Sequence, residues 1–131
     1  MAKILVVEDE ESQRKVLREM LLISGYTTLE AGNGVEGLET ALRERPDLIL
    51  MDVRMPLMDG MAMMHALRQN PWGKHVSIII FTNYDNTEAQ LVQITADQPS
   101  YYLLKANTPL DTIAEKIEEV LNSNKKQENT I

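Results

Sequence analysis

Cysteine is absent from the 131 residues of this sequence, which excludes disulfide bonds and metal sites built on thiolates. Long apolar runs are absent as well, since none approaches the roughly 20 residues that a membrane-spanning helix needs. The first apolar run, Ile4 to Val7, is followed at once by four acidic residues, a pattern that does not fit a secretory signal peptide. We therefore expect a cytoplasmic chain with no membrane insertion.

Basic residues are outnumbered, with 13 Lys and Arg against 20 Asp and Glu and a net charge of −7. Nucleic acids and anionic membranes attract basic surfaces, so this balance argues against direct nucleic-acid binding. The hydrophobic content of 44% and charged content of 25% are ordinary for a globular chain, and the length suits one domain. The charge as a whole is explained by solubility alone.

Short apolar runs alternate with amphipathic, helix-like patterns along the whole chain. This alternation predicts an α/β fold, a doubly wound five-stranded parallel sheet flanked by five helices. One run is more polar than the others and is expected near a sheet edge. The predicted strands are 4–7, 26–31 (the polar one), 47–52, 76–81 and 101–104.

Three predicted helices begin with an N-cap signal, a short polar residue followed three positions later by an acid. The last helix has an apolar stripe that ends at Leu121, and we expect the polar tail 122–131 to fray. The predicted domain is therefore 1–121. The three N-cap pairs are Asn33 with Glu36, Asp85 with Glu88, and Thr108 with Asp111.

The segment LILMDVRMPLMDG (48–60) places a lone carboxylate, Asp52, at the end of a predicted buried strand. Pro56 prevents a helix from starting directly afterwards, so the chain must form a loop there. In a parallel sheet all strands point the same way, so the residues that end the other strands are expected beside Asp52 on one rim. They are Glu8, Asp9, Thr82 and Lys105.

This rim combines three carboxylates, one hydroxyl and one ammonium. Two carboxylates about 5 Å apart repel by roughly 3 kcal/mol, so three together require a cation. Oxygen donors without cysteine or a nearby histidine select a hard ion such as Mg²⁺. A carboxylate in this setting can accept a phosphoryl group, because Lys105 and the metal neutralise charge and Thr82 donates a hydrogen bond.

Four motifs, KILVVEDE, LILMDVRMPLMDG, IIIFT and YYLLK, make residues 2–121 resemble a response-regulator receiver domain of two-component signalling. The resemblance implies a chemotaxis-regulator-like, flavodoxin-like fold with strand order 2-1-3-4-5. It also implies transient phosphorylation by the phosphohistidine of a histidine kinase or phosphotransfer protein. The implied roles are Asp52 as phosphoacceptor, Asp9 and Asp52 as Mg²⁺ ligands, Glu8 as a ligand through water, the Arg54 carbonyl as a further ligand, Thr82 as switch hydroxyl, Lys105 as phosphate-binding ammonium and Tyr102 as switch aromatic.

Several residues depart from the pattern of that family. Ala106 replaces a proline that is commonly cis, so we predict a trans Lys105–Ala106 bond and an altered loop. Asn83 is larger than the usual residue and is expected to narrow access to Asp52. Arg54 and Tyr84 flank the site, and we expect their bulk to shield the acyl phosphate from water. Gln98-Pro99-Ser100 replaces the usual glycine-containing approach to the last strand.

The expected function is a phosphorylation-activated switch, not a turnover enzyme, with output to an unknown protein through the fourth helix, last strand and fifth helix. One alternative is a constitutive interaction domain that is rarely phosphorylated. Another is a Mg²⁺-dependent phosphohydrolase with an aspartyl intermediate, although Arg54 stands where such enzymes carry a second acid. A dinucleotide-binding domain is disfavoured because no Gly-x-Gly-x-x-Gly follows the first strand.

Overall fold

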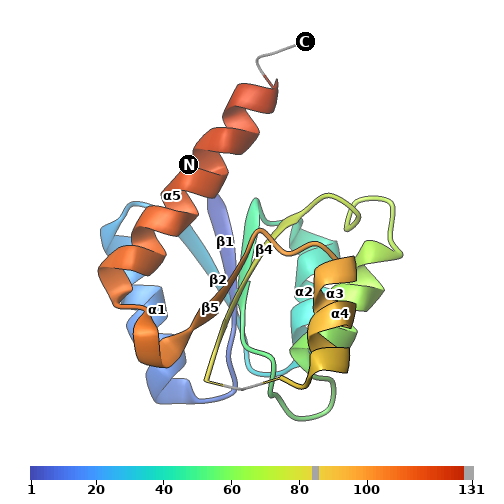
Figure 1. The fold of residues 1–131 in the computed structure, drawn as a ribbon. Helices are drawn as coiled ribbons and strands as arrows, with labels where there is room; N and C mark the ends of the chain where they lie inside the picture. The colour runs from blue at the N-terminus through green and yellow to red at the C-terminus, as the bar shows by residue number, and fades with distance from the viewer. Residues whose placement is uncertain (84–85, 129–131) are drawn as a thin grey trace.

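The computed structural model describes residues 1–83 and 86–128, and in this part of the chain strand and helix alternate five times (Figure 1). A single 3₁₀ turn interrupts the alternation after the last strand. The elements are β1 (Lys3–Val7), α1 (Glu11–Ile23), β2 (Thr27–Ala31), α2 (Gly34–Glu44), β3 (Leu48–Met51), α3 (Gly60–Arg68), β4 (Ser77–Thr82), α4 (Glu88–Ala96), β5 (Tyr101–Leu104), the 3₁₀ turn η1 (Lys105–Asn107) and α5 (Leu110–Glu128).

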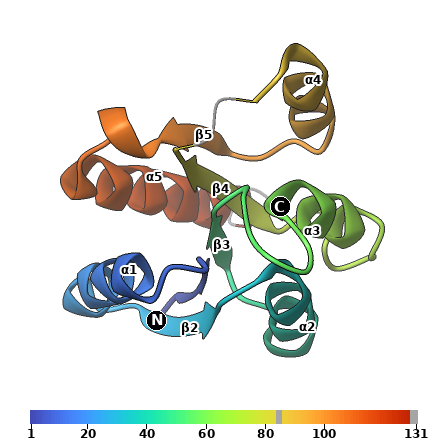
Figure 2. The same ribbon diagram turned by 90° about the horizontal axis from the view of Figure 1, so that it is seen from below.

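The strands form one parallel sheet in the order β2-β1-β3-β4-β5, which confirms the predicted topology. Helices α1 and α5 cover one face of this sheet, and α2, α3 and α4 cover the other (Figure 2). The polar strand β2 lies at an edge, as its composition indicated. The chain therefore has the doubly wound architecture in which ligands bind at the carboxyl ends of the strands.

Along the central strands, the side chains of successive residues point alternately into two hydrophobic cores, one on each face of the sheet. Ile4 and Val6 of β1 pack with the apolar residues of α1 and α5, whereas Leu5 and Val7 pack with those of α2 and α3. All four side chains are fully buried. Because both faces of the sheet are covered, β1, β3 and β4 are continuous apolar runs with no polar alternation.

Helix N-caps follow the sequence signals in α2 but not in α4. Asn33 caps α2, with its side chain accepting a hydrogen bond from the Glu36 amide at 2.8 Å. The predicted cap of α4, Asp85, lies outside the described residues, and the helix instead begins after Thr87. Thr87 and Gln90 form a reciprocal capping box, which satisfies two backbone donors at once and sets the start of α4.

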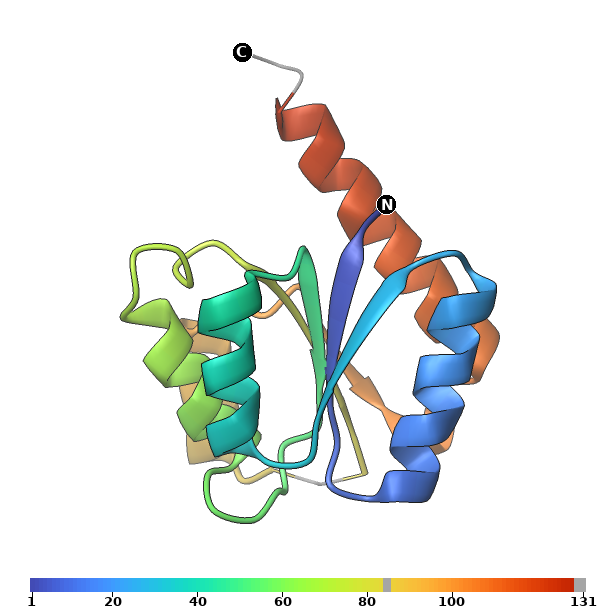
Figure 3. The ribbon, with the colours of Figure 1, turned by 180° about the vertical axis from the view of Figure 1, so that it is seen from behind.

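Helix α5 runs on past Leu121, where the sequence predicted a frayed tail, and it projects beyond the sheet (Figure 3). Lys, Gln and Glu are good helix formers. In addition, Asn124 Nδ2 donates to Ser77 Oγ at 2.9 Å and ties the extension to β4. The helix therefore extends beyond the predicted domain end at Leu121, and the fraying of 122–131 stays a prediction. Among the described residues, no helix is long and apolar enough to cross a membrane.

Candidate functional site

The register of the sheet brings the predicted strand-end residues to one rim. Val7 pairs with Met51, so the next residues, Glu8 and Asp52, leave neighbouring strands at the same level. The Asp52 amide continues the ladder by donating to the Val7 carbonyl at 3.1 Å. Thr82 ends the next strand, β4, and is fully buried.

Three carboxylates gather on this rim. Glu8, Asp9 and Asp52 each offer an oxygen, and the three oxygens lie within 4.8 Å of one another. Glu8 and Asp52 are buried, whereas Asp9 is exposed. Such a set of hard oxygen donors fits Mg²⁺, which prefers carboxylates and keeps several waters. The Arg54 carbonyl remains a predicted ligand, and Arg54 lines a hollow of about 440 Å³ beside Asp9.

Lys105 supplies the cation of the rim in this structure. Its Nζ donates to Glu8 Oε2 at 2.8 Å and to Asp52 Oδ2 at 3.0 Å. A third hydrogen bond goes to the side-chain oxygen of Gln13, on the first turns of α1. The ammonium also lies 5.7 Å from the centre of the Phe81 ring. The predicted convergence of Lys105 with the carboxylates is therefore present, and Gln13 is an addition that the sequence did not reveal.

The pKa values of the rim show how much negative charge is confined there. The pKa of Glu8 is raised to about 7, chiefly by burial and also by the charge of Asp52, against the lowering effect of the hydrogen bond from Lys105. Burial by itself lowers the pKa of Lys105, but its hydrogen bonds to Glu8 and Asp52 outweigh burial, so the net pKa is raised. One ammonium does not neutralise this cluster, and a divalent cation suits it.

Asp52 is held in a fixed orientation. Its Oδ1 accepts a hydrogen bond from the Val53 amide at 2.7 Å, while Oδ2 accepts from Lys105. The loop that follows returns close to Asp52, because the Gly60 amide donates to the Val53 carbonyl at 2.7 Å. Both carboxylate oxygens of Asp52 are therefore oriented by the protein.

Tyr102, the predicted switch aromatic, is half-buried on β5. Its ring packs against the core under α2, α3 and α4, and Asn86 Nδ2 donates a hydrogen bond to its hydroxyl. The structure thus places the aromatic ring inward and links it to the segment that leads into α4. The switching roles of Thr82 and Tyr102 remain predictions.

The peptide bond after Lys105 is trans, as predicted from Ala106. The described residues contain no cis peptide bond, so Lys105–Ala106 is trans, and the chain turns into the 3₁₀ helix η1. Two other departures are also placed: Asn83 is exposed after β4, and Gln98 adopts a left-handed backbone with φ of 53°. Tyr84 lies outside the described residues.

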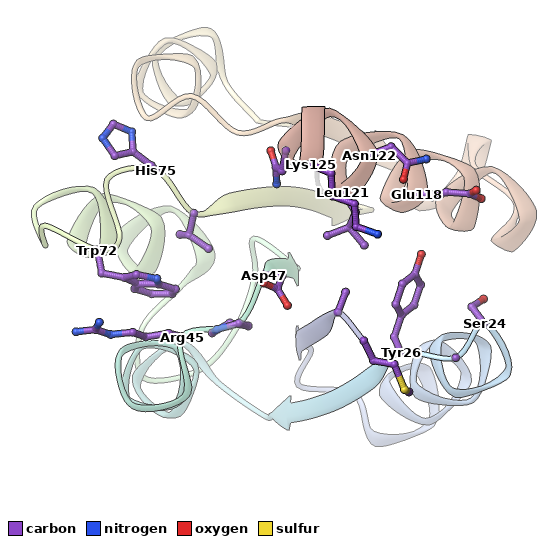
Figure 4. Close-up of a pocket in the computed structure, with 16 residues that line it drawn as sticks. Ser24, Tyr26, Arg45, Asp47, Trp72, His75, Glu118, Leu121, Asn122 and Lys125 are labelled. Carbon is purple, nitrogen blue, oxygen red and sulfur yellow. The ribbon is translucent and has the colours of Figure 1, made fainter. Parts of the chain in front are cut away.

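A larger hollow, of about 970 Å³, lies at the opposite end of the strands, beside the C-terminal part of α5 (Figure 4). It is bordered by residues that precede the strands, including Tyr26, Asp47 and His75, and by Leu121 of α5. None of the rim residues lines this hollow. The rim is thus the better candidate site because three carboxylates and an ammonium converge there, and not because of its size.

Comparison with known proteins agrees with this geometry. A family model described as the response regulator receiver domain matches residues 4–118. The polar-differentiation response regulator DivK of Brucella anthropi is 36% identical over 81 residues, 62% of this chain and 66% of that protein. Sporulation initiation phosphotransferase F of Bacillus subtilis is 38% identical over 82 residues, 63% of this chain and 64% of that protein. The matches thus span a little under two thirds of these curated relatives.

Among solved structures, the chemotaxis response regulator CheY4 of Vibrio cholerae superposes with a TM-score of 0.82 and 29% identity. The match covers 92% of this chain and 98% of that one. The structural similarity therefore extends over nearly the whole chain.

Proposed function

The chain belongs to the response regulator receiver family, and from this premise we propose that Asp52 accepts a phosphoryl group from the phosphohistidine of a histidine kinase or phosphotransfer protein. The observation that carries the proposal is the Lys105 ammonium between Glu8 and Asp52, beside Asp9. The names of the two curated relatives, a response regulator and a phosphotransferase, support a place in a phosphorelay.

Each rim residue has a distinct task in the proposed transfer. As an Asp52 oxygen bonds to phosphorus, the bond to the donor imidazole nitrogen breaks, and that nitrogen keeps the electron pair. Lys105 then donates to a phosphoryl oxygen, and Thr82 donates to another. Glu8, Asp9, Asp52 and the Arg54 carbonyl would hold Mg²⁺, which when bound neutralises charge on the carboxylates and the phosphoryl group.

The proposed output passes through the face formed by α4, β5 and α5 to a separate protein, without direct binding of nucleic acid. On α4, Leu91 and Val92 expose 42% and 67% of their surface, while Ile94 is buried in the core. A phosphoryl group that draws Thr82 towards Asp52 would change the contacts of Tyr102 and its bond to Asn86. The exposed apolar residues of α4 would then meet their partner in an altered position.

The proposal predicts that the chain gains one phosphoryl group when it is incubated with acetyl phosphate and Mg²⁺, because the small donor supplies the same group without a partner protein. Intact-mass spectrometry measures the gain, and excess EDTA is expected to prevent it. A chain that stays unmodified would instead be the constitutive interaction domain. Continuous release of phosphate from a phosphate ester would indicate the phosphohydrolase.

Arg54 is expected to lengthen the life of the acyl phosphate. Its exposed side chain borders the hollow beside Asp9, where its bulk would limit the access of water to the phosphoryl group. Arg54→Asn is therefore expected to speed hydrolysis several-fold without preventing phosphorylation. The measurement is the decay of the phosphorylated mass after removal of the donor, with Arg54→Lys as a control of similar length. An unchanged decay would show that Arg54 does not shield the site.

A further inference from the structure

Gln13 closes a ring of hydrogen bonds around one side of the rim. Its Nε2 donates to Glu10 Oε2 at 2.6 Å, and its oxygen accepts from Lys105 Nζ. The Glu10 amide donates to Glu8 Oε1 at 3.2 Å, and Glu8 Oε2 accepts from Lys105 at 2.8 Å. The ring thus joins the loop after β1, the first turns of α1 and the end of β5.

An ammonium has three N–H donors, and in this structure they are directed to three acceptors of different chemistry. Two of them, on Glu8 and Asp52, are carboxylates. Under the proposed function both change partners: Glu8 turns to the metal, and Asp52 loses its charge when it becomes an acyl phosphate. The third acceptor, the Gln13 amide, is neutral and has neither task.

We propose that Gln13 is a positioning residue that keeps the Lys105 ammonium at the rim while its two carboxylate partners are engaged elsewhere; this rests on the proposed function of Asp52. A lysine side chain loses considerable freedom when it is fixed, so a permanent acceptor lowers the cost of placing the ammonium. Glutamine suits this position because its nitrogen, bound to Glu10, turns its oxygen towards Lys105.

Gln13→Met tests the proposal, since methionine keeps the length and apolar stem but removes the acceptor. With acetyl phosphate and saturating Mg²⁺, the rate of phosphorylation is expected to fall about tenfold to a hundredfold, as for loss of one hydrogen bond to a charged group. Ser12→Ala, at the exposed neighbouring position of α1, is the matched control and is expected to keep the wild-type rate. The thermal midpoint of Gln13→Met should match that of the control.

A double-mutant cycle shows whether Gln13 acts through Lys105. In a Lys105→Met background, Gln13→Met is expected to cause no further loss of rate, because the ammonium that it positions is already absent. Equal losses in both backgrounds would overturn the proposal. Wild type and Gln13→Met reacting at one rate would overturn it too, whereas a wild type that gains no phosphoryl group contradicts the proposed function itself.

The hydrogen bond between Lys105 and Gln13 can also be examined by NMR, without phosphorylating the protein. The ¹⁵N–¹H signal of the Lys105 ammonium, identified by its loss in Lys105→Met, reports how slowly these protons exchange with water. With Mg²⁺ present, we expect this signal to persist in the wild type and to be lost in Gln13→Met. A signal that persists equally in both would show that Gln13 does not hold the ammonium.

Discussion

Asp52→Asn is expected to abolish phosphorylation, with a rate loss of at least about a thousandfold, because the nucleophile itself is removed. An amide oxygen is a far weaker nucleophile than a carboxylate, and the substitution also removes one of the three carboxylates proposed to hold Mg²⁺. The measurement is the mass gained with acetyl phosphate and Mg²⁺. Among the described residues, Asp52 is the only carboxylate that accepts hydrogen bonds from both the Val53 amide and Lys105, so we expect no other residue to replace it as acceptor.

The fold of the Asp52→Asn variant is expected to survive. Asparagine keeps the shape of the side chain, and Lys105 retains its ion pair with Glu8. The pKa of Glu8 should fall towards its ordinary value, because the charge of Asp52 no longer raises it. Asp59→Asn is the matched control: Asp59 caps α3 on the same loop, and asparagine caps equally well. Undiminished phosphorylation of Asp52→Asn would rule out Asp52 as the acceptor.

The rim could be predicted from the sequence because strand ends are well marked. The apolar runs of β1, β3 and β4 stop abruptly at Glu8, Asp52 and Thr82, and a parallel sheet necessarily brings such ends together. Burial on both faces made these runs continuous, which separated them from the helices around them. The negative charge of the rim, and the expectation that a cation binds there, then followed from the presence of three carboxylates among these residues.

The contact between Gln13 and Lys105 could not be predicted in the same way. The two residues are 92 positions apart, and Gln13 belongs to no apolar periodicity that would place it at the rim. The start of α4 was misplaced because the reciprocal capping box of Thr87 and Gln90 sets it, a pair that the sequence analysis did not consider. The length of α5 was underestimated because its apolar stripe ends at Leu121, whereas good helix formers and the Asn124–Ser77 bond continue it.

Gly60→Ala is expected to lower the free energy of unfolding by about 3 kcal/mol, the upper range for an inserted methyl group in a tightly packed place. A Cβ at residue 60 would lie 2.2 Å from the Asp52 carbonyl oxygen and 3.0 Å from the Val53 Cα. Both are backbone atoms of the segment that carries the phosphoacceptor, so relief of the clash requires that segment to move. Phosphorylation with acetyl phosphate should therefore slow as well.

Urea denaturation of Gly60→Ala and Gly32→Ala separates this clash from the general effect of replacing glycine. A Cβ at residue 32 would meet only Arg14 Nη1, at 3.4 Å, an ordinary contact with the end of a flexible side chain. Gly32→Ala is thus expected to change the free energy of unfolding by no more than about 0.5 kcal/mol. Similar urea midpoints for the two variants would mean that the backbone after Asp52 moves away from the added methyl group at little cost in free energy. The close return of Gly60 would then not be what fixes Asp52 in place.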